Sequence, residues 1–200
     1  MRIFKRFLLI SSILSILTGI ILITLSLADL HQSEAETENA LVKAKEKVRT
    51  KEGRTASREE NTSIQYEKGE VIGILEIPRL KAELPIIEGT NEDELERGVG
   101  HYDTSVFPGQ ADQIVLSGHR DTVFRRLGEV EIGDILHIVM PYGKFSYKIE
   151  KSQIVDANNP SIIQSTAPIE TLIVSTCYPF SFIGDAPYRY VLTAYRAESK

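Results

Sequence analysis

The stretch IETLIVSTCYPF, residues 169–180, places the only cysteine of the chain at the end of an apolar run. Its aliphatic and β-branched residues are typical of a buried strand, and Tyr178-Pro179 supplies the turn that ends it. An inert cysteine is expected in the middle of such a strand, where it behaves as a small apolar side chain. Cys177 stands at the strand's end, which favours a reactive thiol over a structural one.

Similar short runs, separated by turn residues, fill the chain on both sides of this stretch. We expect strands at 72–78, 83–89, 112–119, 134–140, 144–156, 169–176 and 188–196. Residues 90–100 begin with a capping residue and acids and end in glycine, which predicts a short helix. The triplet Pro141-Tyr142-Gly143 predicts a hairpin. Seven or eight short strands with few helices predict a mostly β fold, and a closed or nearly closed barrel would hide the strand edges.

The N-terminus predicts the cellular compartment. Residues 1–6 are basic, and residues 7–27 carry no charged side chain. As a helix such a run spans about 31 Å, enough to cross the hydrocarbon core of a bilayer. We therefore expect a cytoplasmic N-terminus at 1–6, a single-pass membrane anchor at 7–28 and an extracellular remainder. A cleaved signal peptide is the alternative, and it gives the remainder the same outward location.

Residues 29–68 are expected to be an extracellular stalk that separates the membrane from a folded domain at 69–200. The segment is rich in Glu, Lys, Ala and Thr and nearly empty of large apolar residues. Because it has too little apolar surface to bury a core, we expect it to be partly helical and partly disordered.

Composition excludes several classes of function. The formal net charge of −5 gives no basic footprint, so nucleic acid is not an expected partner. One cysteine permits no internal disulfide and no cysteine-based zinc site, and the four histidines are far apart in sequence. We expect no cofactor and no structural metal, and a calcium site on acidic loops remains open. In an oxidising compartment a thiol without a role reacts or forms disulfides between chains. A lone cysteine there therefore favours a functional thiol.

Three residues at expected strand ends form a coherent set for nucleophilic catalysis. His119 follows one apolar strand, Cys177 follows another, and Arg189 begins the last one. A thiolate is an effective nucleophile, and a neighbouring imidazole both activates it and protonates a leaving amine. A guanidinium is a permanent donor for the oxyanion that develops during acyl transfer.

Four separated blocks together resemble the sortases, the membrane-anchored cysteine transpeptidases of Gram-positive bacteria. The blocks are GVGHYDTSVFPGQ (98–110), LSGHRDT (116–122), STCYPF (175–180) and APYRYVLTA (186–194). The resemblance covers about residues 71–196 and is closest to the class D sortases of bacilli. Members of the family often have Thr-Leu where this chain has Ile173 and Val174, and both of these residues suit a strand. The Asp-Pro-Phe or Asp-Pro-Trp lid of pilus-building members does not occur, which argues for anchoring of proteins to the wall.

By position, the resemblance makes Cys177 the nucleophile, His119 the acid and base, and Arg189 the stabiliser of the oxyanion or the substrate. It implies cleavage of a Leu-Pro-x-Thr-type sorting signal near the C-terminus of a secreted protein, through a thioester. Transfer to an amine of peptidoglycan or its lipid-linked precursor would follow, and in bacilli that amine belongs to diaminopimelate.

Substrate-binding residues are expected beside these three. The loop 157–168 is expected to wall an apolar groove for the Leu and Pro of the signal. The predicted substrate-binding residues are Thr176, Ile162, Ile163, Ala167 and His101, the last because it lies in a Gly-flanked segment that could line the cleft.

The residues alone leave two alternative functions open. A cysteine peptidase would use the same three residues with water as the acceptor. A non-catalytic, membrane-tethered β domain would bind the wall or partner proteins and would not depend on Cys177. Asp121 could orient His119, although a cap on the following turn is the preferred interpretation, and Tyr178 and Phe180 are expected to pack within their loop.

Overall fold

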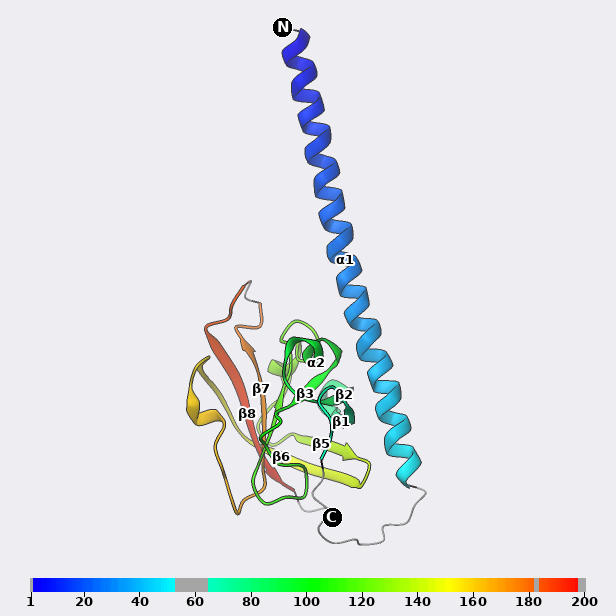
Figure 1. Ribbon diagram of the computed structural model, residues 1–200. Helices are drawn as coiled ribbons and strands as arrows, with labels where there is room; N and C mark the ends of the chain where they lie inside the picture. Colours follow the sequence, from blue (N-terminus) through cyan, green and yellow to red (C-terminus); the bar gives the residue numbers. More distant parts are fainter. Residues whose placement is uncertain (1, 53–64, 182–183, 198–200) are drawn as a thin grey trace. The chain divides into compact units, whose positions relative to one another are not determined.

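A computed structural model describes residues 2–52, 65–181 and 184–197, with side chains described for 11–26, 34–50, 65–181 and 184–197 (Figure 1). The chain divides into two compact units, residues 1–36 and residues 37–200. One long helix, α1 (Arg2–Glu52), runs across that boundary, so its last turns belong to the second unit.

Within the described residues the second unit contains a closed barrel of eight strands (Figure 1). The strands are β1 (Val71–Ile77), β2 (Ala82–Glu88), β3 (Val99–His101), β4 (Gln113–Ser117), β5 (Ile135–Met140), β6 (Gly143–Asp156), β7 (Thr171–Tyr178) and β8 (Tyr188–Arg196). Their order around the barrel is β1-β2-β3-β4-β7-β8-β6-β5, with β2–β3 and β4–β7 parallel and the other neighbours antiparallel. The predicted closed β-barrel is confirmed, and closure pairs the strand edges that would otherwise be open.

The short helical segments lie in the connections. They are α2 (Glu92–Arg97) and three 3-10 turns at Pro78–Leu80, Leu127–Glu129 and Pro160–Ile162. The α2 helix begins after Asn91, whose backbone N–H donates to the Glu94 carboxylate at 2.9 Å. The helix predicted over 90–100 is therefore shorter than expected, because its last residues leave it to form β3. The predicted hairpin is confirmed between β5 and β6.

Side chains alternate between the inside and the outside of the barrel wall, as the pleat of a strand requires. On β4, β7 and β8 the inward set belongs to the main core: Ile114, Leu116, Leu172, Val174, Leu192 and Ala194. The outward set on the same strands forms a smaller apolar cluster of Val115, Ile173 and Val191, covered by Tyr102 and Ile162. We call these three residues the outer cluster.

The last turns of α1 pack on the outside of the barrel. Ala40, Ala44 and Val48 recur every four residues, are at most 8% exposed and belong to one cluster with apolar side chains of β1 and β2. Lys47 adds a hydrogen bond of 2.9 Å to the Val71 carbonyl. Part of the predicted stalk, residues 40–48, therefore packs against the barrel, and residues 53–64 of that segment lie outside the described residues.

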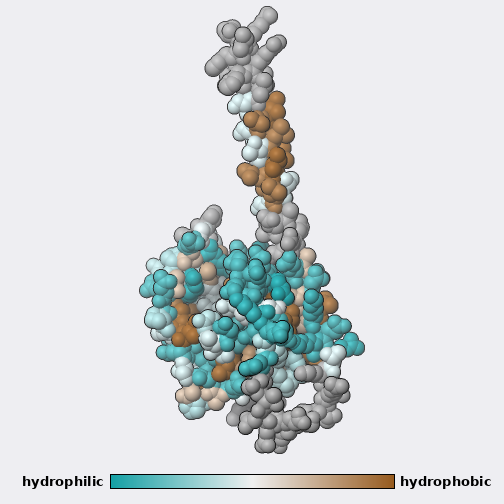
Figure 2. Space-filling view, viewed as in Figure 1, coloured by the Kyte–Doolittle hydropathy of each residue, from teal (hydrophilic) through white to brown (hydrophobic). Residues whose placement is uncertain are grey.

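The first unit exposes large apolar side chains along α1. Ile13, Leu14, Leu17, Ile20 and Leu22 are each more than half exposed, and Figure 2 shows a hydrophobic band on this helix. In the part of the chain that the structure describes, no helix is long and apolar enough to cross a membrane. The predicted anchor, residues 7–28, reaches beyond the described side chains at both ends.

Candidate active site

Cys177 and Arg189 are brought together by the pairing of β7 with β8. The antiparallel register places Cys177 directly opposite Arg189, and two residues earlier Ser175 lies opposite Val191. Directly opposed residues present their side chains on the same face, with Cβ atoms about 5 Å apart. Because Val191 belongs to the outer cluster, the thiol and the guanidinium share the outer face of the barrel.

His119 reaches the same place from β4, which runs parallel to β7. The aligned pair Ser117 and Ser175 is followed two residues later by His119 on one chain segment and Cys177 on the other. Gly118 continues the ladder, because its N–H donates to the Ser175 carbonyl at 3.2 Å. A Cβ at Gly118 would lie 2.7 Å from two neighbouring side chains, so the backbone that leads to the imidazole passes where only glycine fits.

Thr176 links these two strands from inside the barrel. Its side chain is 3% exposed, and its hydroxyl donates to the Gly118 carbonyl at 2.7 Å. A buried hydroxyl requires such a partner, and this one fixes the residue that precedes His119. The side chain of Thr176 therefore does not make the predicted contact with a substrate, because it points away from the face that carries Cys177.

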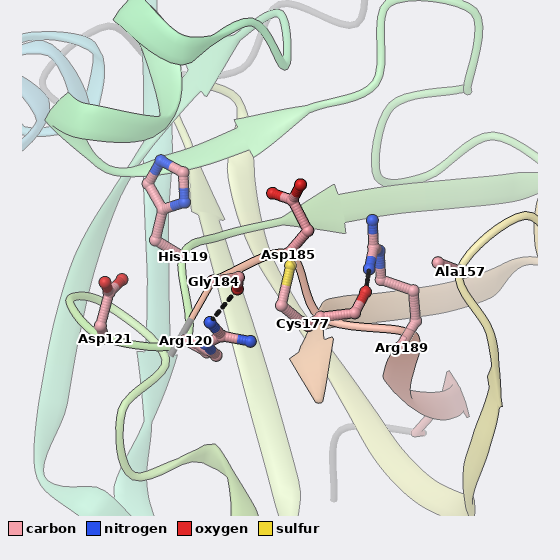
Figure 3. A pocket seen from close by; sticks show the side chains of 9 residues that line it. His119, Arg120, Asp121, Ala157, Cys177, Gly184, Asp185 and Arg189 are labelled. Atoms are coloured by element: carbon pink, nitrogen blue, oxygen red, sulfur yellow. Dashed lines mark hydrogen bonds between the residues drawn. The ribbon is translucent and has the colours of Figure 1, made fainter. Parts of the chain in front are cut away.

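His119, Cys177 and Arg189 line one pocket of about 380 Å³ (Figure 3). In Figure 3 Cys177 lies between the other two, and its thiol points to the same side as the guanidinium. Cys177 is partly exposed and lines this pocket. The remaining lining residues are Arg120, Asp121, Ala157, Gly184, Asp185 and Ala186.

Backbone carbonyls orient the guanidinium of Arg189. Its Nη1 donates to the carbonyls of Ala186 at 3.2 Å and Tyr188 at 3.1 Å. A guanidinium has five N–H donors in a rigid fork, so these contacts fix its position and leave donors for an anionic group in the pocket. The imidazole Nε2 of His119 lies 3.6 Å from a carboxylate oxygen of Glu92 on α2, a contact that solvent screens because Glu92 is mostly exposed.

The predicted groove residues lie on the β6–β7 loop, residues 157–170. Ile162 packs on the outer cluster, Ile163 lines a second pocket of about 170 Å³ with Gln113, and Ala167 is exposed. The pocket around Cys177 is lined from this loop by Ala157. The contacts of Ile162, Ile163 and Ala167 with a substrate stay predictions.

His101 is a residue of the barrel wall. It is 1% exposed, and its Nδ1 lies 2.8 Å from the Oε2 atom of buried Glu88. Its Nε2 lies 3.1 Å from the Ser105 hydroxyl, and its ring stacks on Phe107. The prediction that His101 binds substrate is wrong, because the Gly-flanked segment is strand β3 and turns this imidazole inward.

Sequence reasoning missed several residues of the pocket. Arg120, whose Nη2 donates to the Gly184 carbonyl at 2.9 Å, directly follows His119 and could have been found by its position. Nothing in the sequence placed Ala157 and Asp185 in the pocket, because their positions depend on the paths of two loops through the folded chain. Among the described residues, no group of three or more His, Cys, Asp or Glu side chains is arranged to hold a metal ion.

Known proteins with similar sequences are sortases. The sequence profile described as the sortase domain matches residues 75–197. The chain is 50% identical to Sortase D of Bacillus subtilis (strain 168) over 161 residues, which cover 80% of this chain and 81% of that protein. It is 32% identical to Sortase SrtE1 of Streptomyces coelicolor over 114 residues, which cover 52% of this chain and 32% of that protein.

Solved structures with the same fold are also sortases. The Sortase D5 transpeptidase of Clostridium perfringens matches 82% of this chain and 99% of its own, with a TM-score of 0.67 and 21% identity. Sortase C1 of Streptococcus suis matches 66% of this chain and 75% of its own, with a TM-score of 0.62 and 25% identity. The domain profile and the relative at 50% identity show that the chain belongs to the sortase family of cysteine transpeptidases.

Proposed function

We propose that this sortase is a membrane-anchored enzyme that cleaves a Leu-Pro-x-Thr-type sorting signal and transfers the protein to a peptidoglycan amine. The observation that carries the proposal is that Cys177, His119 and Arg189 line one pocket. Strands β7 and β8 supply Cys177 and Arg189, and His119 lies two residues beyond the end of β4, so the barrel holds all three groups in a rigid arrangement that suits acyl transfer.

The first half of the reaction uses Cys177 and His119. The thiolate sulfur attacks the carbonyl carbon of the signal's Thr, and the tetrahedral intermediate collapses when the following C–N bond breaks. His119 donates a proton to the departing amine, which leaves as a neutral peptide. The product is a thioester between Cys177 and the protein to be anchored.

Arg189 stabilises the charge that develops on the carbonyl oxygen. Its guanidinium stands opposite the thiol and is already oriented by two backbone carbonyls, so little reorganisation is needed when the oxyanion forms. Electrostatic stabilisation by a preorganised donor is usually the largest single contribution to such a reaction.

The second half resolves the thioester with an amine. The proposed acceptor is the side-chain amine of diaminopimelate in a peptidoglycan stem or its lipid-linked precursor. His119 accepts the proton of the attacking amine, an amide bond forms, and the thiol is released. The proposed location is the outer face of the cell membrane, with residues 7–28 as the anchor; the uncharged run at 7–27 and the exposed apolar residues of α1 support it.

The test uses the full chain in detergent micelles with peptides in which Leu-Pro-x-Thr is followed by Gly, Ala or Ser. Intact mass should show an adduct equal to the peptide up to Thr, and added diaminopimelate should convert it to an amide. Release of the free acid with diaminopimelate present would instead identify a peptidase.

Two variants test the assigned groups. Cys177→Ala should form no adduct, and an amide product from that variant would refute the nucleophile. Arg189→Lys should lose at least tenfold in the rate of adduct formation, because an ammonium lacks the planar fork. Arg126→Lys is the matched control, because Arg126 pairs with Glu129 on the surface outside the pocket.

A further inference from the structure

The β6–β7 loop borders the active-site pocket at one end and is held by another part of the chain at its other end. Ala157 lines the pocket, and its N–H donates to the Pro187 carbonyl at 3.0 Å. Ile162 covers the outer cluster on the face that carries Cys177. The loop therefore follows that face away from the thiol.

The carboxylate of Asp112, just before β4, binds the far part of this loop. Its Oδ1 accepts the backbone N–H of Thr166 at 2.6 Å and of Ala167 at 3.1 Å, and its Oδ2 accepts the Ser165 hydroxyl at 3.0 Å. Hydrogen bonds to an ionised acceptor are roughly twice as strong as those between neutral groups. One side chain thus fixes three consecutive loop residues.

Gln113, the next residue, binds the middle of the loop through both ends of its amide. Its Nε2 donates to the Ile162 carbonyl at 3.0 Å, and its Oε1 accepts the Gln164 N–H at 3.0 Å. The side chain is 6% exposed, so water competes little for these bonds. The amide acts on the loop as a strand neighbour would, with one donor and one acceptor.

The backbone of Asp112 secures the end of the loop as well. The Thr171 N–H, at the start of β7, donates to the Asp112 carbonyl at 3.1 Å. Most of these contacts reach loop backbone atoms, so they define the loop's conformation while the loop's own side chains remain free to vary.

We propose that Asp112 and Gln113 are positioning residues that hold residues 162–167 in the conformation required to bind the sorting signal, without touching it. This inference rests on the proposed function. A loop that must become ordered on binding lowers affinity by the entropy of ordering, and a loop that is already ordered avoids that loss. The two residues would therefore set KM, while kcat depends on Cys177, His119 and Arg189.

The test compares full-length variants by hydrogen exchange and by kinetics of adduct formation with Leu-Pro-x-Thr peptides. Asp112→Ala should raise KM by about tenfold, equivalent to about 1.4 kcal/mol, with kcat within about twofold. The amides of residues 162–167 should exchange at least tenfold faster, with β7 and β8 unchanged. Asp112→Asn keeps a neutral acceptor and should give intermediate values. Asp103→Asn, on an exposed turn nearby, is the matched control and should behave as the unmodified chain.

Four outcomes separate the inferences. Unchanged loop exchange in Asp112→Ala, or faster loop exchange with unchanged KM, overturns the positioning role. Faster exchange throughout the barrel also overturns it, because the residue would then serve global stability. If the unmodified chain forms no adduct with any peptide, the proposed function fails, and the exchange data alone still decide whether Asp112 holds the loop.

Discussion

Replacing Thr176 with valine separates a structural role of this residue from a substrate-binding one. Valine has nearly the same shape and removes only the hydroxyl that donates to the Gly118 carbonyl inside the barrel. A buried acceptor that loses its donor costs about 1–3 kcal/mol. A central value of about 2 kcal/mol lowers the Tm of a domain of this size by about 4–8 °C.

The same change should impair catalysis through His119. Gly118 directly precedes the imidazole, and a displacement of about 1 Å in a catalytic group can cost up to about a hundredfold in rate. Thr176→Val should therefore lower kcat for adduct formation by about ten- to a hundredfold with little change in KM. Thr176→Ser, which keeps the hydroxyl, should retain most of kcat.

Thermal denaturation and intact-mass kinetics on the full chain measure both effects. The reasoning is refuted if Thr176→Val keeps its Tm and kcat but raises KM, because that pattern belongs to a side chain that binds the substrate. Equal losses of kcat in the serine and valine variants would likewise show that the hydroxyl is not what holds Gly118.

Three further predictions concern the surroundings of the site. His101→Ala leaves Glu88 buried without its partner, so unfolding free energy in chemical denaturation should fall by about 3 kcal/mol while adduct formation per folded molecule changes less than twofold. Ala44→Asp places a carboxylate in the buried contact between α1 and the barrel and should lower the Tm by several degrees, whereas Val42→Asp on the exposed side should not. The backbone N–H groups of the β6–β7 loop lower the pKa of Asp112, so its stabilising effect is present above the unfolded pKa near 3.9 and is lost as pH falls through the lower folded value. Loop amides should then lose protection in acid, and this pH dependence should vanish in Asp112→Asn; its persistence would assign it to another group.

Much of the fold and the centre of the site could be predicted because their signals are local. Strand periodicity and turn residues indicated seven of the eight strands, and the positions of His119 and Cys177 at strand ends followed from them. The three-residue strand β3 was too short to show a period and was absorbed into the predicted helix.

What could not be predicted depended on contacts between distant residues. His101 looked like a loop residue, and only the parallel pairing of β2 with β3 places Glu88 beside it. The four-residue spacing of Ala40, Ala44 and Val48 indicated that this face of α1 packs against something. The indication was weak, because the residues are small and the strands that cover them come later in the chain. The contacts of Asp112 with the β6–β7 loop join residues more than fifty positions apart.

The register of β7 and β8 fixes the pair of catalytic residues separately from the loop residues that line the pocket, so the two can change independently. Eight aligned pairs, from Thr171–Tyr195 to Tyr178–Tyr188, hold Cys177 opposite Arg189 whatever connects the two strands. A slip by one residue would send a reactive side chain into the barrel, whereas a longer connection costs only a slowly rising closure entropy. The part of this connection that supplies Gly184 and Asp185 to the pocket can thus be redesigned as a cassette while the transfer reaction is retained, provided that the Ala186 carbonyl stays in place to orient Arg189.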